Sequence, residues 1–93
     1  MKGYEFHPEA EIDLDAIWEF TAEDNHRAAD RMIDQIESTI EALVPFPAQG
    51  HRRPDLTSRP LRIILGARIS VAYTPDEKPL WIVAIMHGRA ALG

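Results

Sequence analysis

The chain has 93 residues and no cysteine, and its formal net charge is −5 at pH 7. This length suits one domain, residues 1–93, with a modest core, and the lack of cysteine excludes a disulfide framework and thiol chemistry. The acidic balance argues against broad, nonspecific binding of nucleic acid, because such binding depends on many Lys and Arg side chains that neutralise phosphates together.

The N-terminal residues predict a short strand followed by a helix. Tyr4 and Phe6 alternate with polar residues over 2–7, as in a strand. Pro8 suits the first turn of a helix over about 8–23, since its missing N–H would be unpaired there in any case.

A second helix follows, and it is the clearest element of the sequence. Asn25 can cap its start, and Pro45 and Pro47 end it. Residues 46–59 then form a predicted loop that is rich in proline and charge, and a loop of this length in a small domain is often functional. The apolar residues of the helix recur at helical spacing: Ala29, Met32, Ile33, Ile36, Ile40, Leu43 and Val44.

Three strands are predicted in the C-terminal half, over 61–65, 69–73 and 80–87. A three-residue loop, 66–68, would place Leu65 opposite Ile69 and collect the apolar residues on one face. In that register Arg62, Ile64, Ser70 and Ala72 lie on the other face. The layout is β-α-α-β-β-β, which is an α+β fold.

The charge is divided between the two halves of the chain. Residues 1–44 contain twelve acidic and three basic side chains, whereas residues 45–93 contain seven basic and three acidic ones. This division places the candidate functional residues in the basic half. The longest apolar run, 80–86, is far shorter than the roughly 20 residues of a membrane span, and the N-terminus lacks an apolar signal core, so the sequence predicts a cytoplasmic protein without membrane contact.

Several short segments carry a family resemblance through their order and spacing. They are His7-Pro8-Glu9-Ala10, residues 13–17, the helical stretch 28–43, the loop residues Pro47, Gly50, Asp55, Leu56 and Arg59, the strand pair ending at Tyr73, and residues 85–89. Together they resemble the toxins of the RelE/ParE superfamily, which are small bacterial proteins encoded beside an antitoxin.

The resemblance implies a helical hairpin packed on one face of a twisted antiparallel sheet, and a cognate antitoxin whose C-terminal segment wraps the toxin. Because two helices cover only one face, we expect the other face to remain partly apolar and exposed. Arg62, Arg68 and Arg89 would rim it, and a partner would bind there. Operator DNA would be contacted only through the antitoxin.

Two activities compete within this superfamily. RelE-like members are ribosome-dependent endoribonucleases that act on mRNA and use basic residues and a proton-transferring group. Here His87 would be the general acid, with Arg62, Arg68 and Arg89 around the phosphate. ParE-like members inhibit DNA gyrase and are not known as nucleases. The acidic net charge and the sequence Ala90-Ala91-Leu92, where many RelE-like enzymes have a tyrosine or a further base, favour the ParE-like activity.

The remaining candidates are weaker. Arg52 and Arg53 follow His51 in the predicted loop and could contact an acidic partner, although such clusters are usually only solvated. The acids near the first helix are explained by the helix dipole, so we expect no metal and no cofactor. The sequence therefore predicts a bacterial toxin that binds gyrase and its antitoxin through Arg52, Arg53, Arg62, Arg68, His87 and Arg89. The alternatives are the ribosome-dependent endonuclease and a non-toxic antitoxin-binding module.

Overall fold

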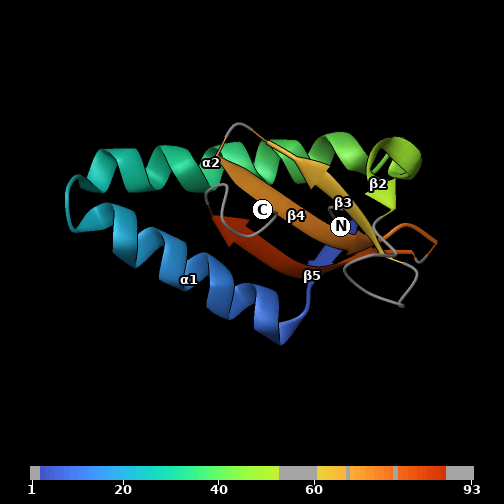
Figure 1. The fold of residues 1–93 in the computed structure, drawn as a ribbon, viewed down its shortest axis with the longest axis horizontal. Coiled ribbons are helices and arrows are strands. Elements are labelled where there is room, and N and C mark those ends of the chain that lie inside the picture. The colour runs from blue at the N-terminus through green and yellow to red at the C-terminus, as the bar shows by residue number, and fades with distance from the viewer. Residues whose placement is uncertain (1–2, 53–60, 67, 77, 88–93) are drawn as a thin grey trace.

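A computed structural model describes residues 3–52, 61–66, 68–76 and 78–87. Two helices, α1 (Pro8–Ala22) and α2 (His26–Leu43), form a hairpin beside a five-stranded sheet (Figure 1). This arrangement confirms the α+β class. The other elements are β1 (Tyr4–Phe6), the 3-10 helix η1 (Pro47–Gln49), β2 (His51–Arg52), β3 (Arg62–Leu65), β4 (Ile69–Thr74) and β5 (Leu80–His87).

The sheet is mixed, whereas the family resemblance implied an antiparallel one; the difference lies in β1. The strand order is β1-β5-β4-β3-β2, and β1 runs parallel to β5 while the other neighbours are antiparallel. The helical hairpin and three strands separate β1 from β5 in the sequence, so no tight turn forces these two strands to run in opposite directions. The short strand β2 lies within the region predicted as a loop.

Both helices begin where the capping residues predict. The ring of His7 accepts a hydrogen bond from the amide of Glu9 at 3.3 Å, with Pro8 in the first turn. The side chain of Asn25 accepts from the amide of Ala28 at 3.1 Å. The apolar faces of both helices pack against the sheet and form the core with it. The core contains Ala10, Ile17, Met32, Ile36, Ile40, Leu43, Val71, Tyr73, Leu80, Ile82 and Ile85.

The register between β3 and β4 differs from the predicted one by one residue. Ile64 pairs with Val71 and Leu65 with Ser70, and the ladder continues as the amide of Gly66 donates to the carbonyl of Ile69 at 2.7 Å. The chain therefore reverses one residue later than the predicted loop would allow. Because a shift of one residue exchanges the two faces of a strand, Arg62 and Ile64 lie on the helix side.

A β-bulge in β5 changes which side chains face the helices. Ala72 pairs with Ala84 but Tyr73 pairs with Ile82, so Val83 is an extra residue in β5. Before the bulge Ile82 faces the core, and after it Ile85 does. His87 then falls on the same face as Ile85, toward the helices.

Tyr73 fastens the connection between α2 and β2 to the sheet. Its side chain is fully buried, and its hydroxyl donates to the carbonyl of Pro47 at 2.6 Å and accepts from the amide of Gly50 at 2.9 Å. A Cβ on Gly50 would lie 2.6 Å from that oxygen, so only glycine fits there. Gln49 adds a bond from its side-chain amide to the carbonyl of Ala42 at 2.7 Å.

We expect Tyr73→Phe to lower the free energy of unfolding by about 1–3 kcal/mol, because the Gly50 amide and the Pro47 carbonyl lose their partner in a buried place. Urea denaturation at pH 7 measures this loss. Tyr4→Phe serves as a comparison, since Tyr4 is also buried, whereas the Gly50 amide and the Pro47 carbonyl bond the hydroxyl of Tyr73. An unchanged stability of Tyr73→Phe would contradict the role given to the hydroxyl.

The same hydroxyl predicts a dependence of stability on alkaline pH. Burial raises the pKa of Tyr73 above 10.0, against smaller opposing effects of the Gly50 amide and the Arg62 charge. The unfolded chain therefore releases this proton first as the pH rises, so the contribution is complete below about pH 10 and is lost above it. Between pH 9 and pH 11 the melting temperature should fall more steeply for the wild type than for Tyr73→Phe. Parallel curves would contradict the contribution of the Tyr73 hydroxyl.

Candidate functional site

Arg62 makes hydrogen bonds within its own chain. It lies in β3 opposite Tyr73, and its guanidinium donates to the carbonyl of Gly50 at 2.7 Å and to that of Ala48 at 3.4 Å. The side chain is half-buried. These bonds hold the same connection that Tyr73 holds, so Arg62 lies beneath η1 instead of on the rim of an open face.

Arg52 lies at the edge of the sheet. It pairs with Arg62 across β2 and β3 and is exposed to solvent. A row of side chains on one face thus runs from Arg52 through Arg62 to Tyr73. Arg53 and Arg89, the other two arginines predicted to bind a partner, lie outside the described residues.

His87 ends β5 against the first helix. Its ring centroid lies 5.8 Å from that of Phe20 in α1, with the ring planes at 73°. This edge-to-face arrangement is the favourable one for two aromatic rings. The bulge at Val83 explains the position, because a regular strand from Ile82 would have turned His87 to the opposite face.

Arg68 shares a hollow with Arg31, which the sequence analysis did not single out. The hollow has a volume of about 320 Å³ and is lined also by Thr21, Ala28, Met32 and Gln35. Neither guanidinium has a hydrogen-bond or ion-pair partner among the described residues. Two unpaired guanidinium groups beside a hydroxyl and an amide can bind a carboxylate or another oxyanion. Arg31 is one of only three basic residues in the acidic half, and that rarity was the available signal.

Of the described residues of the nuclease hypothesis, Arg62 lies apart from His87, whereas Arg68 lies at the same end of the sheet as His87. Arg62 is level with Tyr73 and Ile82, whereas Arg68 adjoins Ile69, which pairs with His87. His87 is five residues along β5 from Ile82, or about 16 Å at the rise of an extended strand. Arg62 and His87 therefore lie toward opposite ends of the sheet.

The second face of the sheet is not open at its centre, which corrects the sequence-based expectation. Ile63, Ser70 and Ala72 point away from the helices, as their pairing shows, yet each is less than a tenth exposed. Of the described apolar residues on this face, Leu65 is the large one that is well exposed, at 54%. Arg62 and Ile64, predicted for this face, lie on the other one because of the shifted register.

A stripe of apolar residues is exposed on α1 instead. Ile12, Ala16 and Phe20 follow at intervals of four residues, and Ile12 and Phe20 are 67% and 65% exposed. Beside them, the carboxylate of Asp13 accepts from the backbone amide of Ile85 at 2.9 Å. Asp13 thus binds a backbone N–H of β5 that lies past the point where β5 pairs with β1.

In the described part of the chain, no group of three or more His, Cys, Asp or Glu side chains could hold a metal ion. None of the described helices is long and apolar enough to cross a membrane.

Comparison with known proteins identifies the family. Residues 4–92 match the family model described as the ParE toxin of the type II toxin-antitoxin system parDE. A solved structure, described as the chromosomal ParDE TA system from P. aeruginosa, has a similar fold, with a TM-score of 0.77 and 21% identity over 92% of this chain and 95% of that one. A search among curated proteins found no similar sequence. Since the family model covers nearly the whole chain, this protein belongs to the ParE toxins of type II toxin–antitoxin systems.

Proposed function

We propose that this ParE toxin inhibits DNA gyrase in the bacterial cytoplasm and that a cognate antitoxin neutralises it. The observation that carries the proposal is the match of residues 4–92 to the ParE family model. ParE-like inhibition requires a binding surface and no catalytic centre. It therefore does not require the arginines and the histidine to lie together, as a nuclease would.

The described geometry speaks against the ribosome-dependent nuclease. Arg62 Nη1 donates to the backbone carbonyls of Gly50 and Ala48, so this guanidinium is already engaged by the fold. His87 lies edge-on to Phe20 near the other end of the sheet. A general acid and a phosphate-binding base must act on one reacting group, so the separation of Arg62 from His87 argues against a site that uses both.

Two features of the surface suit an antitoxin. The hollow of Arg31 and Arg68 is a local cationic site beside a largely acidic helical hairpin, so it would attract acidic side chains of a partner. The stripe of Ile12, Ala16 and Phe20 offers apolar area on the same hairpin. The similar structure from P. aeruginosa is named as a ParDE system, which supports a protein partner of this kind.

A supercoiling assay tests the activity. Purified toxin should block the supercoiling of relaxed plasmid by gyrase and leave linear DNA after protein removal, and added antitoxin should restore supercoiling. Cleavage of ribosome-bound mRNA that is abolished by His87→Ala would instead establish the nuclease. Unaffected growth on expression without antitoxin would leave only a binding module.

We expect Arg31→Gln and Arg68→Gln each to weaken antitoxin binding by about tenfold, since a hydrogen bond to a charged group contributes about 1.5–3 kcal/mol. Calorimetric titration with the antitoxin encoded beside the toxin measures the affinity. Arg27→Gln is the matched control, because Arg27 is exposed on the same helix but does not line the hollow. Equal affinities of all three variants would show that the hollow takes no part in binding.

A further inference from the structure

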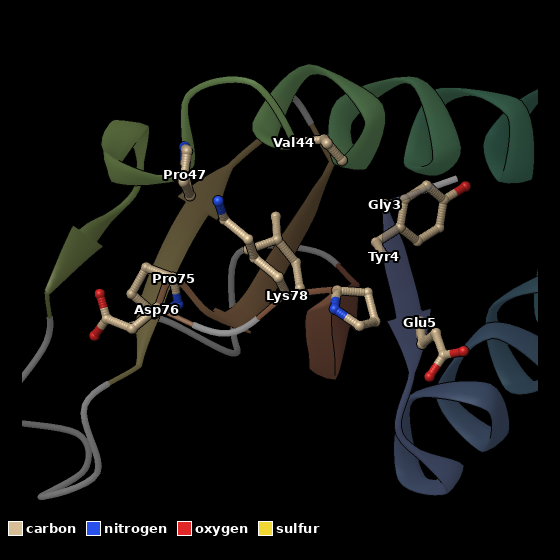
Figure 2. A pocket seen from close by; sticks show the side chains of 10 residues that line it. Gly3, Tyr4, Glu5, Val44, Pro47, Pro75, Asp76 and Lys78 are labelled. Atoms are coloured by element: carbon tan, nitrogen blue, oxygen red, sulfur yellow. The ribbon is translucent and has the colours of Figure 1, made fainter. Parts of the chain in front are cut away.

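An apolar pocket lies at the end of the molecule away from the helix–helix turn. It has a volume of about 640 Å³ and forms where the start of β1, the end of α2 and the β4–β5 turn meet. Figure 2 shows Pro47, Pro75 and Lys78 on one side of it and Gly3, Tyr4 and Glu5 on the other. The volume is within the range of pockets that hold ligands or large side chains.

The walls of the pocket are held in place by contacts among its lining residues and by the Tyr73 hydroxyl. Gly3 has a φ of 81°, and a Cβ there would lie 2.7 Å from Cγ1 of Val44, so β1 and α2 approach as closely as glycine allows. The amide of Leu80 donates to the carbonyl of Gly3 at 3.0 Å. Pro47 is fixed through the Tyr73 hydroxyl. The pocket is therefore formed before any partner arrives.

An exposed aromatic residue adjoins one of the residues that line this pocket. Phe46 precedes Pro47 in the sequence and is 68% exposed, so it does not fill the pocket of its own chain. Its backbone amide donates to the carbonyl of Leu43 at 3.1 Å, which anchors the residue to the end of α2. A surface that carries an apolar side chain and an apolar pocket side by side is complementary to itself under two-fold symmetry.

The charges at the mouth of the pocket also permit a second copy. The chain as a whole carries a charge of −5, and the helical hairpin is mostly acidic, so most surfaces of two copies repel each other. Here Glu5, Asp76 and Lys78 all line the pocket, with Glu5 on the side opposite Lys78 (Figure 2), and all three are exposed. Two copies can therefore place Lys78 of each near an acid of the other.

From these observations we infer that this face joins two copies of the chain, with Phe46 of each molecule in the pocket of the other. Association through one aromatic side chain and a small polar rim resembles weak, transient interfaces more than permanent ones. The inference does not depend on gyrase inhibition, because the dimer face shares no residue with the hollow of Arg31 and Arg68.

Sedimentation equilibrium of the purified toxin, free of antitoxin, tests the inference. The wild type should show an apparent mass that rises toward twice the monomer mass with concentration, and Phe46→Ala should weaken the association at least tenfold. Phe20→Ala is the control, since Phe20 is equally exposed but lies on α1. Lys78→Glu should weaken association as well, and adding Asp76→Lys to it should restore association in part.

Three results would overturn the inference. A monomer at every concentration up to the millimolar range would exclude a second copy as the occupant. A dimer weakened by Phe20→Ala but not by Phe46→Ala would place the interface on α1. If antitoxin alone shields Phe46 and the pocket from solvent in an amide-exchange experiment, and the free toxin stays monomeric, the pocket belongs to the antitoxin interface. Circular dichroism confirms that each variant is folded.

Discussion

The hydroxyl of Tyr73 is the point at which the sheet is joined to the connection after α2. A buried hydroxyl is costly unless both its donor and its acceptor capacity are used, and here Pro47 and Gly50 use them. With Gly50 held against the ring, the carbonyls of this connection face Arg62, which binds two of them. The same anchoring fixes Pro47 as a pocket wall and leaves Phe46 outside it. One side chain thus determines what an apparently functional arginine can do and where an exposed aromatic stands.

The bulge at Val83 has a comparable effect at the other end of the sheet. By reversing the alternation of β5 it brings Ile85 into the core and His87 against Phe20. Beyond the bulge, the backbone amide of Ile85 lies past the end of the pairing with β1, and it donates to the carboxylate of Asp13 instead. An acid that looks like one of several solubilising residues in α1 is therefore a structural contact between helix and sheet.

The helices could be predicted from the sequence because their signals are local. Pro8, Asn25 and the apolar spacing of α2 act within one or two turns. The side chains on each face of the sheet could not be predicted, because β3 has apolar residues on both sides. In addition, neither the late reversal at Gly66 nor the bulge changes the alternation of apolar and polar residues in the sequence. The Arg31 and Arg68 hollow depends on a contact between distant segments, so composition alone could only indicate that Arg31 was unusual.

Among the described residues, the division of charge in the sequence does not become a basic face. Of the described arginines of the basic half, Arg62 binds backbone carbonyls, Arg52 stands at a sheet edge, and Arg68 joins Arg31 from the acidic half. A protein that gripped a polyphosphate would need many of these groups on one surface, since each neutralised phosphate adds to the affinity. Scattered cations beside apolar patches suit recognition of proteins instead, because there a few well-placed charges set the orientation while apolar contacts supply affinity. Both partners proposed for this toxin, gyrase and the antitoxin, are proteins.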